Sequence, residues 1–246
     1  MRVIRNHIAT LMAGRRDFFS CFRKNKISEG GNARLCSSER VFVRPNEDIY
    51  SAITVGENLS LDVVILAIGC KNCKIFLKFK LEAFSRLKCL VLVERSEVAD
   101  INMVIELNGD HSRSEIKNFF VGENFNRQIF SLSQVHNAKH SLSTAASKVI
   151  LDDFSTAEFY GDISIAEIAT GCDARQRSDS ILLSSEAKAT SCPNLNILNN
   201  AVKCSHGATV GTIDRRAIFY MMSRGLNEQT CKRLIVDGEL AAMISA

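Results

Sequence analysis

The feature that most constrains this sequence is a regular succession of short apolar runs. Runs begin at positions 61, 75, 89 and 103, so that their starts lie 14 residues apart. Within 75–81 the side chains alternate, with leucine and phenylalanine on one face and Lys78 and Lys80 on the other. This period of two is typical of a half-buried β-strand. The sequence therefore predicts an all-β core.

The pattern of short apolar runs continues to residue 210, and the residues between the runs indicate how the strands connect. Further strands are expected at 61–68, 89–94, 103–107, 116–121, 128–132, 147–151, 158–163, 180–184, 194–198 and 202–210. Only one Asn-Gly pair, Asn108-Gly109, offers a tight hairpin turn in this stretch. Regular spacing with so few hairpin signals favours stacked coils, each of which buries its apolar face against its neighbours. We therefore predict a β-solenoid, with a β-sandwich as the alternative.

Composition and charge exclude several classes of protein. The chain has 246 residues, of which 46% are hydrophobic and only 2 are proline, which argues against a largely disordered chain. The longest apolar run, 63–68, falls far short of the roughly 20 residues of a membrane helix. The net charge is +4, but residues 1–28 hold seven basic side chains against one acid. The rest is nearly neutral, so we expect neither a nucleic-acid-binding face nor a membrane partner.

The cysteines indicate the cellular compartment of the protein, and changes in sequence pattern along the chain indicate its domains. Nine scattered cysteines and the absence of a secretory apolar region predict free thiols in a reducing, cytoplasmic compartment. An organelle transit peptide is the alternative for the arginine-rich start. We expect a basic helical segment and linker over 1–40, a β core over 41–211 and a helical subdomain over 212–246.

The C-terminal segment reads as a helical hairpin. Residues 214–224 lack both alternation and chain breakers, and Gly225 follows where a glycine commonly ends a helix. Asn227 is placed to cap a second helix, which we expect to end at about Gly238 for the same reason. About 25 residues are too few to fold alone. The hairpin must therefore pack on the β core or on a partner.

Three groups of side chains are candidates for metal or redox chemistry. Cys70 and Cys73 form a lone Cys-x-x-Cys pair, which we interpret as two thiols at a turn between coils. His136 and His140 have a helical metal-ligand spacing, but they lie in a polar stretch that predicts surface histidines. Cys204 and His206 are the strongest candidates.

Cys204 and His206 lie two residues apart on an expected strand, so both side chains project from one face. A thiolate beside an imidazole suits iron, iron–sulfur species and other borderline metals. Nearby Gly207 and Gly211 let a ligand or another backbone approach closely. The alternative is that both residues are ordinary interior side chains of the solenoid.

This segment and the helices after it resemble the C-terminal signature of SufD-type proteins of the SUF iron–sulfur cluster assembly system. The matching stretches are Lys-Cys-Ser-His-Gly-Ala-Thr-Val-Gly at 203–211, Ala-Ile-Phe-Tyr at 217–220, Ser-Arg-Gly at 223–225 and Lys-Arg-Leu at 232–234. The resemblance is specific over about 136–240 and only textural over 41–135. Two departures are Asn200-Ala201, where the family has an acidic pair, and Cys192 in place of a basic residue.

The resemblance implies a right-handed parallel β-helix and a non-enzymatic scaffold role in a SufBCD complex. A SufB-like paralogue would pair with the β-helix end, and a SufC-like ATPase would bind the C-terminal helices; a homodimer is the alternative for the isolated chain. A transient iron–sulfur cluster or iron would form at the junction, with His206 as ligand and Cys204 as accessory thiol. The implied ATPase-docking residues are Asp214, Ile218, Phe219, Tyr220, Met222, Arg224, Gly225 and Leu234. No P-loop is present in the sequence, so ATP hydrolysis would be the partner's step.

Two other functions stay open on the sequence alone. A metal-dependent enzyme could bind zinc through Cys204 and His206, but it needs a third protein ligand, which no neighbouring residue supplies. A purely structural solenoid would bridge other subunits and leave its thiols inert.

Overall fold

The computed structural model describes residues 31–35, 39–43 and 48–245. They fall into two compact units, and the boundary between these lies between Gly211 and Thr212. The predicted basic helical segment at the start of the chain lies outside the described residues.

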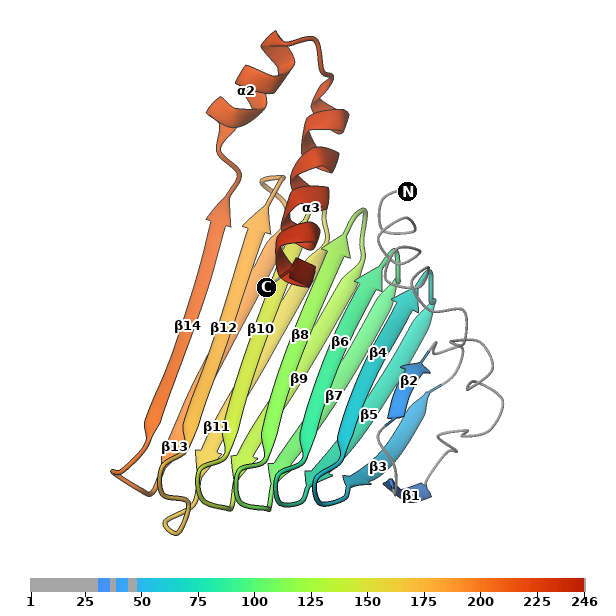
Figure 1. Cartoon of the computed structure of the whole chain (residues 1–246). Helices are drawn as coiled ribbons and strands as arrows, with labels where there is room; N and C mark the ends of the chain where they lie inside the picture. Colours follow the sequence, from blue (N-terminus) through green and yellow to red (C-terminus); the bar gives the residue numbers. More distant parts are fainter. Residues whose placement is uncertain (1–30, 36–38, 44–47, 246) are drawn as a thin grey trace. The chain divides into compact units, whose positions relative to one another are not determined.

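The first unit is a parallel β-solenoid, as predicted (Figure 1). Its strands are β1 Gly31–Leu35, β2 Glu39–Val43, β3 Ile49–Val55, β4 Ser60–Ile68, β5 Asn72–Leu81, β6 Arg86–Glu94, β7 Val98–Leu107, β8 Arg113–Gly122, β9 Arg127–His136, β10 Leu142–Leu151, β11 Thr156–Ile165, β12 Asp173–Leu182, β13 Lys188–Ile197 and β14 Lys203–Thr212. Odd-numbered strands form sheet A and even-numbered strands form sheet B, with 7 strands in each. Consecutive strands therefore alternate between the sheets, and one strand of each makes one coil. The parallel pairing rules out the sandwich alternative, which needs antiparallel hairpins.

The strand register explains the period found in the sequence. Arg86 of β6 pairs with Arg113 of β8, 27 positions later, and Leu142 of β10 pairs with Asp173 of β12, 31 positions later. Because each coil contains two strands, a spacing of about 14 residues marks half a coil. Pairing already begins at Gly31 in β1, inside the stretch that the sequence indicated as a linker.

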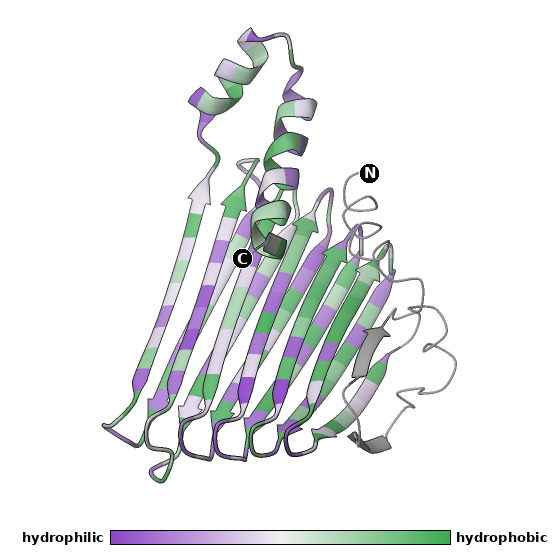
Figure 2. Cartoon of the chain, viewed as in Figure 1, coloured by the Kyte–Doolittle hydropathy of each residue, from purple (hydrophilic) through white to green (hydrophobic). Residues whose placement is uncertain are grey.

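The solenoid interior changes from apolar to polar along the chain. Hydrophobic colour dominates β4 and β6 in Figure 2, whereas β12 is largely hydrophilic. From β8 onward the interior contains buried polar side chains, some of which pair with one another, whereas others, such as Ser114 and Ser178, have no side-chain partner among the described residues. The Asn118 amide donates to Gln128 Oε1 at 3.3 Å and to Ser147 Oγ at 2.9 Å. Hydrogen bonds thus satisfy polar groups that would be costly to bury alone. Strands with such interiors, including the first half of β12, lack the apolar alternation that would have predicted them.

One corner of the solenoid repeats the same backbone conformation in successive coils. Phe84, His111 and His140 all have positive φ, at 55°, 60° and 54°. Their rings stack, with centroids 5.1 Å apart for the first pair and 5.0 Å for the second. The Asn-Gly pair lies beside this corner and forms no hairpin, because β7 and β8 on either side of it belong to different sheets. A Cβ at Gly109 would overlap the backbone of Ala83. Glycine is needed there for close approach of two coils.

The second unit contains α2 Arg215–Ser223 and α3 Glu228–Ser245. Asp214 caps α2 by accepting a hydrogen bond from Arg216 N at 2.9 Å, and Gly225 follows with φ of +91°. The expected end of the second helix at Gly238 is wrong, since α3 continues to Ser245. Gly238 ends no helix because the residues after it, Glu-Leu-Ala-Ala-Met, favour helix. Neither helix is long and apolar enough to cross a bilayer.

Candidate functional site

The candidate site lies on β14, the last strand of sheet B. In the strand order β14 has a single neighbour, β12, so its other edge is free of pairing within the described part of the chain. All but one of its residues are exposed. The last strand of sheet A, β13, is likewise exposed or half-buried along its length. The final coil is therefore the open end of the solenoid.

Hydrogen bonds fix the register of β14 against β12. Lys203 N donates to Cys172 O at 2.8 Å, as Asp173 N does to Ser141 O between the preceding pair of strands. Cys204 therefore lies beside Ala174, and His206 beside Gln176. Ala174 and Gln176 are buried side chains of the solenoid interior. By the period of two, Cys204 and His206 project from the same inner face of sheet B.

The Cys204 thiol is half-buried at the open end. It packs against the small apolar cluster that contains Ile163, Cys172 and Ala174. Burial raises the pKa of the Cys204 thiol, and the negative charge of Asp173 raises it further. The protonated thiol is therefore favoured in the free chain, and binding a metal would release its proton.

The His206 imidazole is exposed on the edge strand. Two residues along a strand separate its Cα from that of Cys204 by roughly 6 to 7 Å. Within the described residues, no group of three or more His, Cys, Asp or Glu side chains is placed to hold a metal ion. The described chain thus offers two side chains able to bind a metal, both on the inner face of a last coil that no further described strand covers. A metal site built on these two residues would need further ligands from outside this group.

The Cys70 and Cys73 pair belongs to the fold. Cys70 lies half-buried at a turn, and Cys73 is the first buried side chain of β5. Burial, followed by the charge and hydrogen bond of Cys70, raises the pKa of Cys73 to about 12. A thiol this hard to ionise is a poor metal ligand or redox group.

The interpretation of His136 as a surface histidine is wrong, whereas His140 is indeed exposed. His136 is the last residue of β9 and is fully buried. Its ring contacts Ser141 Oγ at 2.7 Å through Nδ1 and Ser143 Oγ at 2.8 Å through Nε2. The polar stretch looked like a loop because the buried imidazole is matched by serines rather than by apolar neighbours. His140 stacks on His111 instead, so the two residues do not form a joint site.

Apolar side chains are exposed along the helical hairpin. No residue of α2 is buried, and exposed fractions reach 74% for Phe219 and 60% for Tyr220. Met222 and, on α3, Leu234 are also exposed. The Arg224 guanidinium lies 5.3 Å from the centre of the Tyr220 ring and is 3.3 Å from its hydroxyl. Such a cluster is typical of a surface that a partner covers.

The sequence reasoning missed one contact that supports the site. The Thr209 hydroxyl donates to the Asp179 carboxylate, which ties the edge strand to β12 three residues after His206. The carboxylate also accepts from Arg177 at 2.7 Å. Asp179 and Thr209 lie one coil apart in the sequence. This spacing predicts their contact only when the strand register is known.

Comparison with protein families identifies the core of the chain. The family model described as "SUF system FeS cluster assembly, SufBD core domain" matches residues 74–239. This match covers about two thirds of the chain, including most of β5, all of β6 to β14 and most of the hairpin.

Individual relatives agree with this match. The chain is 35% identical over 101 residues to an iron–sulfur cluster assembly SufBD family protein of Synechocystis, covering 41% of this chain and 22% of the relative. It is 37% identical over 111 residues to SufD of Escherichia coli, covering 45% and 26%. For SufD of Bacillus subtilis the values are 29% over 139 residues, covering 56% and 32%. The aligned part thus spans only a fifth to a third of each relative.

Proposed function

Because this chain belongs to the SufBD family of the SUF iron–sulfur cluster assembly system, we propose that it is a scaffold subunit of that assembly. Its open solenoid end pairs with a SufB-like paralogue. Its helical hairpin binds a SufC-like ATPase, which supplies the hydrolysis of ATP. Free thiols throughout the described chain suit a reducing, cytoplasmic compartment.

The exposed imidazole of His206 on an edge strand is the observation that carries this proposal. An unpaired strand edge is a template for another strand, and a homologous coil would cover it. Pairing would bring ligands of the partner opposite His206 and Cys204. The two chains together then complete the coordination of iron or a nascent cluster, which is the cargo of the assembly.

The hairpin supports the ATPase-docking part of the proposal. Phe219, Tyr220 and Met222 present an apolar surface from one helix, and Arg224 adds a charge held beside Tyr220. Aromatic and arginine side chains are the residue types that dominate binding energy at interfaces. Movement of the bound ATPase would shift the hairpin and thereby open or close the junction as a rigid-body change.

A metal-dependent enzyme is the weaker candidate. Catalytic zinc needs three protein ligands and one open position. Cys204 and His206 supply two, and the described residues contain no group of three. Turnover by the isolated chain would favour the enzyme over the scaffold.

Co-purification tests the scaffold role. The full chain is co-expressed with SufB-type and SufC-type partners, and the retained ATPase is quantified. Phe219→Ser should lower retention at least several-fold, because a large exposed anchor is lost. Phe125→Ser is the matched control, since Phe125 is also exposed, at 77%, but lies on a solenoid turn. Equal retention by the two variants would refute docking through the hairpin.

A further inference from the structure

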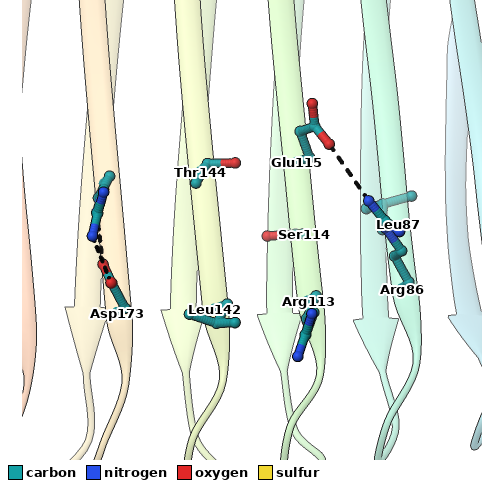
Figure 3. A pocket seen from close by; sticks show the side chains of 9 residues that line it. Arg86, Leu87, Arg113, Ser114, Glu115, Leu142, Thr144 and Asp173 are labelled. Carbon is teal, nitrogen blue, oxygen red and sulfur yellow. Dashed lines mark hydrogen bonds and ion pairs between the residues drawn. The ribbon is translucent and has the colours of Figure 1, made fainter. Parts of the chain in front are cut away.

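A pocket of about 280 Å³ lies on the outer face of sheet B (Figure 3). It is formed by strands β6, β8, β10 and β12, whereas Cys204 and His206 project from the inner face of the same sheet. Three arginines line it, Arg86, Arg113 and Arg175, each from a different strand. The pocket is therefore separate from the proposed cluster site and rich in cationic side chains.

Two of these arginines lie directly beside each other. Arg86 of β6 and Arg113 of β8 are partners in the parallel register. Neighbouring strands are about 4.8 Å apart, and like charges directly opposite each other destabilise a sheet. The pair therefore leaves a local excess of positive charge that an anion would neutralise.

The acidic side chains nearby are already engaged. Glu115 is shared by Lys117 at 3.2 Å, Lys88 at 3.5 Å and Arg86 at 3.9 Å. Asp173 accepts from both Nε and Nη2 of Arg175, at 2.9 and 2.8 Å. Arg113 makes no ion pair with any residue that the structure describes. Its guanidinium is therefore available to donate to a ligand.

We propose that this pocket binds the phosphate group of a small molecule. Guanidinium groups match phosphate with paired hydrogen bonds. Glu115 carries one negative charge that Arg86, Lys88 and Lys117 share, so a phosphate dianion would balance the charge of Arg113 and the remaining positive charge around Glu115. Thr144 lines the same pocket and offers a hydroxyl donor, and Leu142 offers an apolar wall to the remainder of the ligand.

Isothermal titration of the full chain with inorganic phosphate, in low-salt buffer, tests this site. We expect saturable binding at one site per chain, weakened by added sodium chloride. Arg113→Gln should lower the affinity about tenfold or more, as expected for loss of charged hydrogen bonds. It should fold normally, because the change is exposed and relieves a like-charge contact; the thermal midpoint without phosphate checks this.

Arg177→Gln is the matched control. Arg177 lies on the outer face of β12, pairs with Asp179 at 2.7 Å and does not line the pocket, yet the variant loses the same charge. The control should keep the affinity of the unaltered chain. Absence of saturable binding, or an equal loss in both variants, would overturn the proposal, since the latter indicates diffuse attraction to a basic surface.

Discussion

At the scale of single residues, two buried polar side chains of the solenoid interior have defined hydrogen-bond partners. His136 is a buried neutral imidazole between two serine hydroxyls. Gln176 is buried on β12, one coil before His206 of β14, and donates to Gln134 Oε1 at 3.4 Å. Both side chains fit because small neighbouring residues leave space for them, and changes at either place should alter the stability of the solenoid.

Buried His136 should make stability fall in mild acid. Burial lowers the pKa of its ring from 6.5 to about 4, while the charge of Asp173 opposes this shift. The unfolded chain therefore takes up a proton that the folded chain resists. The stability contributed by the neutral ring is complete above about pH 6.5 and is lost as the pH falls toward 4, by roughly 2 kcal/mol at pH 5.

Urea unfolding at pH 7 and pH 5 measures this effect. His136→Gln should reduce the loss of unfolding free energy between the two pH values. His111→Gln, which alters an exposed histidine, should leave the loss unchanged. If the unaltered chain and His136→Gln lost the same unfolding free energy between pH 7 and pH 5, the assignment of this loss to His136 would be contradicted.

Gly161→Ala should destabilise the solenoid. A Cβ at position 161 would overlap the amide of Gln176, which is buried and hydrogen-bonded to Gln134. Overpacking of this kind costs about 1 to 3 kcal/mol. Gly207→Ala is the control, because nothing lies within 4 Å of its added Cβ. Denaturant midpoints should separate the two variants; an unaltered midpoint for Gly161→Ala would show that the amide moves freely.

At the scale of elements, the helical hairpin contains glycines with opposite roles. Gly225 has φ of +91° and ends α2, whereas Gly238 lies inside α3 with open space around it. The sequence suggested the same role for both, since each follows a helical stretch. Only the residues after Gly238, which continue as good helix formers, distinguish them.

Gly238→Ala should therefore stabilise α3. Alanine is about 1 kcal/mol better than glycine inside a helix, which corresponds to roughly fivefold slower amide hydrogen exchange in α3. Gly225→Ala should have the opposite effect on the end of α2, because its positive φ strains any Cβ-bearing residue. Faster exchange in Gly238→Ala would show that α3 does not run through this position.

The strands show how far sequence patterns reach. The half-coil spacing and the alternation in 75–81 predicted stacked coils, and the parallel pairing confirms them. Strands with polar interiors were found only in part, because Gln176 and Ser178 break the apolar alternation that marks a strand. These side chains are buried beside partners that lie one coil away in the sequence. The strand register brings the partners together, and a local sequence pattern does not show that register.

At the scale of the whole molecule, the two ends of the described solenoid differ in how their side chains are buried. Apolar side chains fill the coils around β4 to β7, and the chain ends in an exposed coil of β13 and β14. The sequence predicted that Cys204 and His206 share a face. The structure adds that this inner face belongs to the last coil, which no further described strand covers. The residues of a partner that would complete the site lie beyond any single chain.

The most direct test of this account is the iron and sulfide content of the assembled complex. The full chain is co-expressed anaerobically with SufB-type and SufC-type partners, and the purified complexes of the chain, His206→Ala and His111→Ala are compared. We expect all three complexes to form, with iron and sulfide severalfold lower in His206→Ala alone. Equal iron and sulfide in the His206→Ala complex would contradict the claim that the open end of this solenoid supplies a ligand to a shared cluster.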